Sequence, residues 1–195
     1  MTVAEVFEQV SRDHQFYDKS GGGITVSGGE PLLHEDFVSE LFQLAHAVGI
    51  RTAFESCLCV SPEVVAHILP YTDECMFDIK IFDREKHRSV CGAYNDMVLV
   101  NAKQIAATGI PALPRMPLIP GINDDEQNIR GISSFLCSIG LPKIELMPYH
   151  KYGSSKYRSL DIPYPMGDTP TPDQEAIAKV QNMFIEIGVY CKVSI

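Results

Sequence analysis

Apolar residues recur at helical spacing in several stretches of the chain. Within each stretch they stand three or four positions apart, which places them on one face of a helix. Four of the stretches end at a glycine that is followed at once by apolar residues, namely Gly49, Gly109, Gly140 and Gly188. A glycine in that position is typical of a left-handed helix cap. The pattern therefore predicts one-sided helices that pack on a core and end at these glycines.

Capping residues mark three helix starts. Thr2 and Glu5 have the spacing of a capping box, and so do Thr171 and Gln174. Ser61 stands directly before a proline, a pair that is typical of the first turn of a helix. We therefore expect helices to begin after Thr2, Ser61 and Thr171.

Short apolar runs separate the helices. They cover residues 24–26, 52–54, 76–79, 112–113 and 144–147. Strands that alternate with helices imply an α/β fold with a parallel sheet. Five strands are fewer than the eight of a closed barrel, so a partial (β/α) barrel of five strands competes with a doubly wound sheet, and we favour the partial barrel. An alternating fold should place a strand before its first helix, so we expect the first strand of the barrel to be missing.

The composition fits one domain of residues 1–195. With 45% hydrophobic residues the chain can bury a sizeable core, and its length is short for two independent domains. The formal charge of −9, without a run of lysine and arginine, argues against nucleic acid as a partner. No apolar stretch approaches the roughly 20 residues of a membrane helix, and a signal-peptide pattern is absent, so we expect a cytoplasmic protein that does not bind a membrane.

The six cysteines are scattered along the chain. They are Cys57, Cys59, Cys75, Cys91, Cys137 and Cys191. Their spacing matches neither a disulfide framework nor a zinc site, so we expect them to be small buried hydrophobic residues.

Polar residues follow the predicted strands, where parallel β/α folds bind ligands. They are Ser27, Gly28, Gly29 and Glu30 after the first strand, Glu55 and Ser56 after the second, Asp78 and Lys80 after the third, Arg115 after the fourth and His150 after the fifth. Around one opening, this set suits a zwitterionic ligand with an amino group, a carboxylate and hydroxyls. Singly, each residue also fits a turn, a satisfied ion pair or a surface position. The glycine run at residues 21–23 precedes a strand, so it is not a phosphate-binding loop.

Four motifs in order resemble pyruvate formate-lyase activating enzyme and its relatives, the glycyl-radical enzyme activating enzymes of the radical SAM superfamily. The motifs are Gly22-Gly23-Ile24-Thr25-Val26-Ser27-Gly28-Gly29-Glu30-Pro31, Phe77-Asp78-Ile79-Lys80, Pro117-Leu118-Ile119-Pro120-Gly121-Ile122-Asn123-Asp124 and Leu146-Met147-Pro148-Tyr149-His150. The resemblance extends from about the first helix to Tyr157. It implies a partial (β/α) barrel in which a [4Fe-4S] cluster passes one electron to S-adenosylmethionine (SAM), giving methionine and a 5′-deoxyadenosyl radical. That radical takes a hydrogen from a glycine of a partner glycyl-radical enzyme, and a flavodoxin or ferredoxin is the implied reductant.

The resemblance also implies roles for the residues at the strand ends. Ser27, Gly28, Gly29 and Glu30 are expected to meet the amino group of SAM, Lys80 its carboxylate, and Asp78 and His150 its ribose, while Arg115 matches an arginine near the active site. Glu55, Ser56, the Met76 carbonyl and Asp78 match positions that hold a monovalent cation in relatives, with Glu55 where the family type enzyme has aspartate. A lysine ammonium suits a carboxylate, and an aspartate accepts hydrogen bonds from ribose hydroxyls.

The sequence departs from the family at the cluster. The family ligates it with C-x-x-x-C-x-x-C, and no such motif occurs in this sequence, so the chain resembles a SAM-binding fragment in which the cluster ligands are absent. An absent first strand would leave the edge around Ile24 and Val26 open to self-association. Two other readings compete: a non-catalytic module that binds SAM or the partner, and an unrelated barrel enzyme with Lys80 as a Schiff-base nucleophile. The last ranks lowest because a carboxylate at Asp78 would favour the protonated amine.

Overall fold

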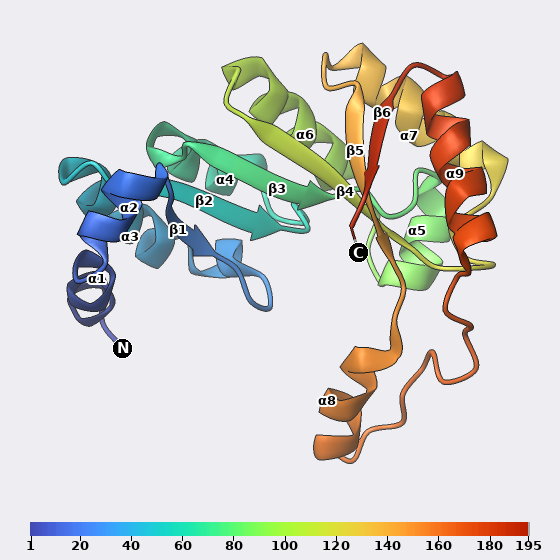
Figure 1. Ribbon diagram of the computed structural model, residues 1–195, viewed down its shortest axis with the longest axis horizontal. Helices are drawn as coiled ribbons and strands as arrows, with labels where there is room; N and C mark the ends of the chain where they lie inside the picture. The colour runs from blue at the N-terminus through green and yellow to red at the C-terminus, as the bar shows by residue number, and fades with distance from the viewer. Residues whose placement is uncertain (195) are drawn as a thin grey trace. The chain divides into compact units, whose positions relative to one another are not determined.

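The computed structural model describes residues 1–194, which form two compact units (Figure 1). The first unit comprises Met1–Asp78 and Arg88–Pro114, and the second comprises Ile79–His87 and Arg115–Ile195. Helix α5 (Arg84–Cys91) and strand β4 (Ala112–Leu118) contribute residues to both units.

The first unit is built on three parallel strands. Its elements are helices α1 (Val3–Ser11), α2 (His14–Ser20), α3 (Glu35–Ala47), α4 (Pro62–Ile68) and α6 (Asp96–Thr108), the short 3-10 helices η1 (Pro31–His34) and η2 (Leu69–Tyr71), and strands β1 (Gly23–Val26), β2 (Arg51–Ser56) and β3 (Glu74–Asp78). Ile24 is in register with Thr52, and Phe54 with Cys75. Fully buried aromatic side chains, among them Phe42, Phe54 and Phe77, form the core where the helices cover the strands.

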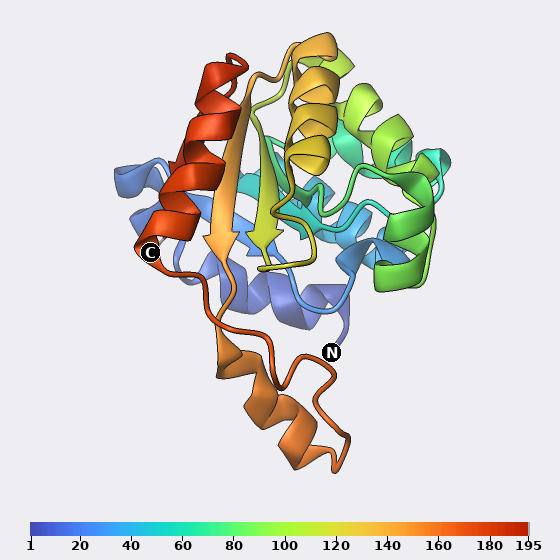
Figure 2. The ribbon, with the colours of Figure 1, turned by 90° about the vertical axis from the view of Figure 1, so that its right-hand side faces the viewer.

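The second unit carries the later strands. Its elements are helices α7 (Glu126–Ser138), α8 (Ser154–Ser159) and α9 (Gln174–Glu186), the 3-10 helix η3 (Lys151–Gly153), and strands β5 (Lys143–Pro148) and β6 (Tyr190–Val193), beside most of β4. Strands β4, β5 and β6 are parallel neighbours, and α9 packs against α7 and β6. Figure 2 shows this unit with α9 in red and β5 in orange.

The strands follow one another in chain order, from β1 to β6, in an open parallel sheet. This order confirms the α/β fold and fits the partial barrel, since a doubly wound sheet reverses its strand order partway. The predicted strand count was too low. Strand β6 was missed because its short run is interrupted by Lys192, a residue type that strands disfavour.

The glycine caps and the first capping box are confirmed. All four glycines have positive φ angles, from 74° at Gly140 to 91° at Gly188. Thr2 is the N-cap of α1 and forms the capping box with Glu5. Ser61 is the N-cap position of α4, although its side chain makes no capping hydrogen bond. The start after Thr171 was wrong: Asp173 caps α9 by accepting from the Ala176 amide, because a carboxylate is favoured at a helix N-terminus.

Within residues 1–194, no helix is both long enough and apolar enough to cross a membrane.

Candidate functional site

The predicted site residues are divided between the two units. The first unit holds Ser27, Gly28, Gly29, Glu30, Glu55, Ser56, Met76 and Asp78, and the second holds Lys80, Arg115 and His150. All but Met76, in the middle of β3, and Arg115 lie at or just beyond the carboxyl end of a strand. Arg115 was wrongly placed at a strand end: β4 continues through Pro117 to Leu118, because alternate side chains stay buried along its whole length.

Hydrogen bonds join the loop after β1 to the end of β2. The Ser27 hydroxyl donates to Glu55 Oε2 at 2.9 Å. The Ser56 hydroxyl donates to Glu30 Oε1 at 2.8 Å, and the Cys57 amide donates to Glu30 Oε2 at the same distance. Two predicted groups, residues 27–30 and residues 55–56, are therefore brought together within the first unit; we call this set of contacts the strand-end clamp.

Glu30 is the centre of the strand-end clamp. Besides the two contacts to the end of β2, its Oε1 accepts from the Leu32 amide at 3.1 Å, which caps η1. A carboxylate offers about four acceptor sites, so three bonds leave room for about one more donor. Glu30 thus has a structural task that the sequence did not reveal, and it retains the capacity to accept from an ammonium group.

The loop between Ser27 and Glu30 presents open backbone. Gly28 has φ of +131°, a conformation that residues with side chains rarely adopt. A Cβ placed on Gly28 or Gly29 would meet no atom within 4 Å, and both glycines are exposed. The loop backbone can therefore be approached closely by a ligand.

The predicted cation ligands lie on neighbouring strands. Glu55 in β2 is in register with Met76 in β3, and Asp78 is the last residue of β3. Ser56 is 6% exposed, and its hydroxyl also accepts from the Leu58 amide at 2.8 Å. The Ser56 hydroxyl thus uses its one donor and one of its two acceptor positions for hydrogen bonds within the chain. A cation bound by these residues stays a prediction.

A buried asparagine that sequence reasoning missed holds the next segment. Leu58 is fully buried and has φ of +55°, an uncommon conformation for a residue with a side chain. The Asn101 side-chain amide donates to the carbonyls of Leu58 at 3.0 Å and Val60 at 2.8 Å. The only sequence signal was a polar residue on the apolar face of the helix that ends at Gly109.

Two further buried asparagines hold the backbone of Lys80 in the second unit. Asn123 Nδ2 donates to the carbonyls of Lys80 at 3.0 Å and Pro117 at 2.7 Å, while its Oδ1 accepts from the Ile119 amide at 2.8 Å. Asn123 belongs to the third of the four sequence motifs, but no role was predicted for it.

Asn128, in the first turn of α7, completes this network. Its Oδ1 accepts from the Phe82 amide at 2.7 Å, and its Nδ2 donates to the Asn123 carbonyl at 2.9 Å and lies 3.5 Å from the Lys80 carbonyl. Residues 80–82 are therefore fixed at both ends by side-chain amides, and we call Asn123 and Asn128 the asparagine pair.

Arg115 belongs to a row of charges across the second unit. The register of β4, β5 and β6 places Arg115 opposite Glu145 and Glu145 opposite Lys192. Lys192 Nζ lies 3.0 Å from Glu145 Oε1. Burial acts to raise the pKa of Glu145, but hydrogen bonds from Ser194 and Lys192 and the charges of Lys192 and Arg115 outweigh it, so the pKa is lowered.

Glu145→Gln is expected to lower the free energy of unfolding by about 2 kcal/mol at neutral pH, because Glu145 is 8% exposed and its bonds are charge-assisted. Since folding lowers this pKa, the stabilisation is complete above the ordinary value and is lost as the pH falls through the lowered one. Urea unfolding of both proteins from neutral pH down to about pH 3 should show their stabilities converging in acid. Glu186→Gln, at an exposed position of α9, is the control, and a difference between wild type and Glu145→Gln that is independent of pH would contradict the expectation.

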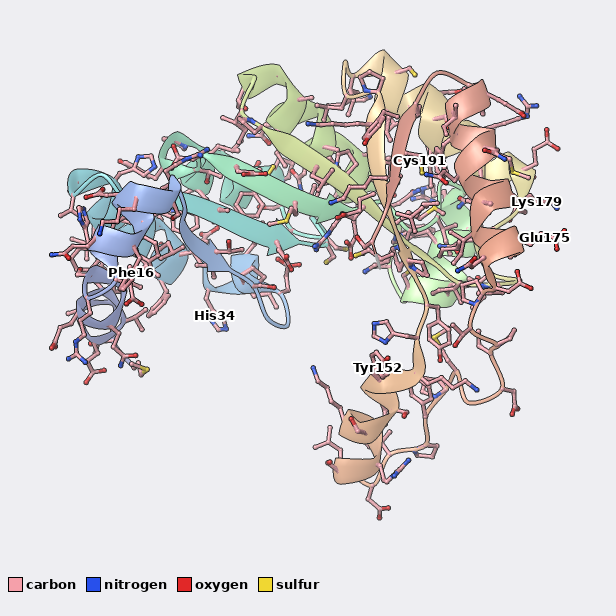
Figure 3. All side chains as sticks on the ribbon, viewed as in Figure 1. Phe16, His34, Tyr152, Glu175, Lys179 and Cys191 are labelled. Carbon is pink, nitrogen blue, oxygen red and sulfur yellow. The ribbon has the colours of Figure 1, made fainter. Side chains whose placement is uncertain are left out.

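His150 lies where the second unit extends an arm, residues 150–167, that carries α8 (Figure 1). Its Nδ1 accepts weakly from the Tyr152 amide at 3.4 Å, and the rings of His150 and Tyr152 are tilted by 39° with their centroids 4.5 Å apart. Tyr152 is 83% exposed on this arm (Figure 3). The Tyr149 hydroxyl lies 2.8 Å from that of Tyr164, which fixes the base of the arm and raises the pKa of Tyr149 to about 12.

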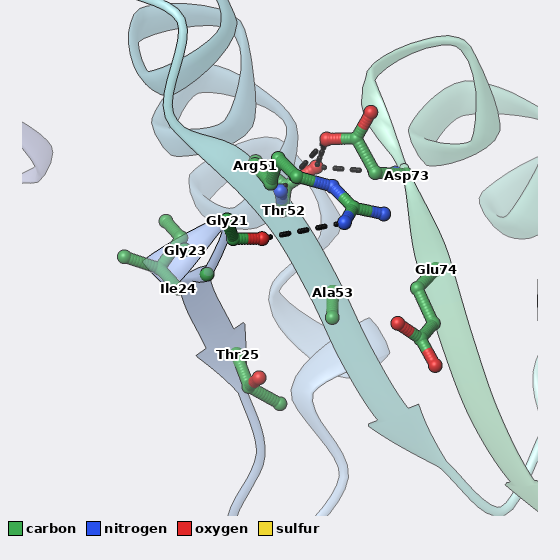
Figure 4. A pocket seen from close by; sticks show the side chains of 10 residues that line it. Gly21, Gly23, Ile24, Thr25, Arg51, Thr52, Ala53, Asp73 and Glu74 are labelled. Carbon is green, nitrogen blue, oxygen red and sulfur yellow. Dashed lines mark hydrogen bonds between the residues drawn. The ribbon is translucent and has the colours of Figure 1, made fainter. Parts of the chain in front are cut away.

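A pocket in the first unit lies at the opposite ends of the strands (Figure 4). It is lined by the residues that begin β1, β2 and β3, including Gly23, Arg51 and Glu74, and Arg51 Nη1 donates to the Gly21 carbonyl at 3.3 Å. Gly23 serves close packing here, since a Cβ on it would stand 2.0 Å from the Arg51 carbonyl oxygen. The pocket contains none of the predicted site residues.

None of the six cysteines, all of which lie within the described residues, is part of a disulfide. Cys75 and Cys191 are buried as expected, and burial raises the pKa of the Cys191 thiol to about 12. Cys91 and Cys137 are exposed, which contradicts the expectation for these two. Among the described residues, the one group of three side chains close enough to share a metal ion is Glu35, Asp36 and His67, which contains no cysteine. The cysteines of this part of the chain therefore do not fit an iron–sulfur cluster.

Comparison with known proteins gives consistent matches. The family model of the radical SAM superfamily matches residues 1–130. The chain is 39% identical over 194 residues to a 4-hydroxyphenylacetate decarboxylase activating enzyme of Clostridioides difficile (strain CD196), covering 98% of this chain and 61% of that protein. It is 37% identical over 199 residues to a (2S)-3-sulfopropanediol dehydratase activating enzyme of Klebsiella oxytoca, covering 99% of this chain and 63% of that one. The chain thus spans about three fifths of the length of these relatives.

A solved structure is similar as well. A domain of pyruvate-formate lyase-activating enzyme from Bacteroides vulgatus ATCC 8482 aligns with a TM-score of 0.73 and 28% sequence identity. The alignment covers 89% of this chain and 99% of that domain.

Proposed function

Because this chain belongs to the radical SAM superfamily, we propose that it is the SAM-binding body of an enzyme that activates a glycyl-radical enzyme. The similarity to activating enzymes supports the proposal. In such enzymes a [4Fe-4S] cluster supplies the electron that splits SAM. Since the described residues contain no group of three cysteines that fits the cluster, the proposal concerns the binding of SAM and its presentation to a protein partner.

The observation that carries the proposal is the strand-end clamp beneath an exposed glycine loop. The clamp leaves the backbone of Gly28 and Gly29 open, and Glu30 has capacity for one more donor, such as the SAM ammonium. In the second unit, the Lys80 ammonium is suited to the SAM carboxylate. We propose that Asp78 and His150 contact the ribose. We also count Arg115, which stands opposite Glu145 in the register of β4 and β5, among the SAM-binding residues.

We further propose the partners of this chain. The protein substrate is a glycyl-radical enzyme, and a flavodoxin or ferredoxin is the reductant. Residues 1–195 act as one radical SAM core domain. Self-association along β1 is a further expectation, supported by the place of β1 at one end of the strand order.

Lys80→Met is expected to weaken SAM binding by about tenfold, because it removes the ammonium that meets the carboxylate. Isothermal titration with SAM and with decarboxylated SAM isolates this contact, since only SAM has the carboxylate. The variant should approach equal affinity for the two ligands. Lys179→Met, at an exposed position of α9 (Figure 3), is the control and should bind as wild type does. A wild-type chain that binds no SAM would refute the proposed function.

The alternative is a SAM-binding module without catalysis. Both readings expect the chain to bind SAM, but a cluster formed after anaerobic incubation with iron and sulfide, judged by visible absorption, would count against the module, since a non-catalytic module needs no source of electrons.

A further inference from the structure

The asparagine pair lies in the interior of the second unit. Asn123 is 1% exposed and Asn128 is 4% exposed. A buried amide is stabilising only when its donors and acceptor find partners. Here both side-chain oxygens accept a backbone amide and both side-chain nitrogens donate to backbone carbonyls, so the network is satisfied and rigid.

The partners of the asparagine pair converge on one short segment. The Lys80 carbonyl and the Phe82 amide are held, two residues apart, and the other partners, Pro117 and Ile119, lie at the end of β4. A plain turn needs no such support from a helical residue, Asn128, that stands 46 positions away from Phe82 in the sequence. The network therefore fixes where the Lys80 backbone lies with respect to the end of β4.

Fixing the backbone matters because a lysine side chain is long and flexible. Fixing the Cα from which the side chain extends restricts where the ammonium can reach, and it reduces the conformational entropy that is lost on binding. We infer that Asn123 and Asn128 are positioning residues that set the grip of Lys80 on the carboxylate of SAM. This inference rests on the proposed function.

The test uses the ratio of affinities for SAM and decarboxylated SAM, measured by isothermal titration on the full chain. Asn128→Ala removes the bonds to Phe82 and Asn123, and is expected to reduce the ratio by about fivefold. Gln127→Ala removes an exposed amide from the neighbouring position of α7 and should leave the ratio unchanged. A purely structural role would weaken both ligands alike and would not move the ratio.

A double-mutant cycle with Lys80→Met makes the test specific. If the asparagine pair acts through Lys80, Asn128→Ala has no further effect on the ratio once the lysine is gone. If Asn128→Ala does not fold, Asn128→Asp replaces it, because a carboxylate oxygen still accepts from the Phe82 amide while the donation to the Asn123 carbonyl is lost.

Two results would overturn the inference: an unchanged ratio in Asn128→Ala, or an equal reduction of the ratio with and without Lys80. A wild-type chain that binds SAM and decarboxylated SAM equally would instead contradict the role of Lys80 itself, and with it the inference. Titration of the wild-type chain with the two ligands reveals that case before any asparagine variant is made, and a wild-type chain that binds no SAM would refute the proposed function itself, so both failures are distinguished from failure of the asparagine pair.

Discussion

Glu30→Ala is expected to lower the free energy of unfolding by about 3 kcal/mol, since a hydrogen bond to a charged group contributes about 1.5 to 3 kcal/mol and water replaces part of the lost bonds at this half-buried position. The substitution removes the acceptor of the Leu32 amide, the Ser56 hydroxyl and the Cys57 amide together. Ser56 is buried, so its hydroxyl cannot turn to water without disturbing the end of β2. Urea unfolding followed by circular dichroism measures the loss, and hydrogen exchange at Leu32 and Cys57 should accelerate.

Glu30→Gln separates the shape of the side chain from its charge. The glutamine oxygen can accept on one side of the clamp, but its NH2 group then faces a second donor, so about half of the loss is expected. Glu63→Ala, at an exposed position of α4, serves as the control for removing a carboxylate from the same unit. A loss below about 1 kcal/mol for Glu30→Ala would show that the clamp contributes little.

Local signals in the sequence were sufficient to predict most helices and strands. The helix ends at Gly49, Gly109 and Gly140 were predicted correctly because a glycine after an apolar helical face has one dominant explanation. The start of α9 was not, because both Thr171 and Asp173 can cap a helix, and the choice depends on the path of the chain before it. The amino-acid composition does not indicate that the chain divides into two compact units.

The site was predicted as a set of positions, and its hydrogen bonds were not. Parallel strands gather their carboxyl ends, which is why Glu30 and Ser56 were both singled out. The hydrogen bond between Glu30 and Ser56 joins residues that are 26 positions apart, and no local sequence pattern encodes such a contact. Asn101 and Asn128 were missed for the same reason: an asparagine usually indicates a turn or cap, and its role here appears only when a distant backbone comes within reach.

Asn123→Ala is expected to destabilise the second unit by about 3 kcal/mol, because three part-buried backbone groups lose their partner at once. These groups are the carbonyls of Lys80 and Pro117 and the amide of Ile119. No water can replace the side chain without opening the network, since the position is 1% exposed. Hydrogen exchange at Ile119 should accelerate sharply, and exchange at Phe82, which bonds to Asn128, should accelerate less.

Gln127→Ala is the matched control for this change, because it also removes an amide but from an exposed position. It should leave exchange at Ile119 unaltered and should change stability by less than about 0.5 kcal/mol. Amides of the first unit, such as those of β2, should keep their protection in Asn123→Ala if the two units respond separately. Slow exchange at Ile119 in Asn123→Ala would mean that another group accepts its amide proton. In that case the asparagine pair would not be what holds the segment of Lys80.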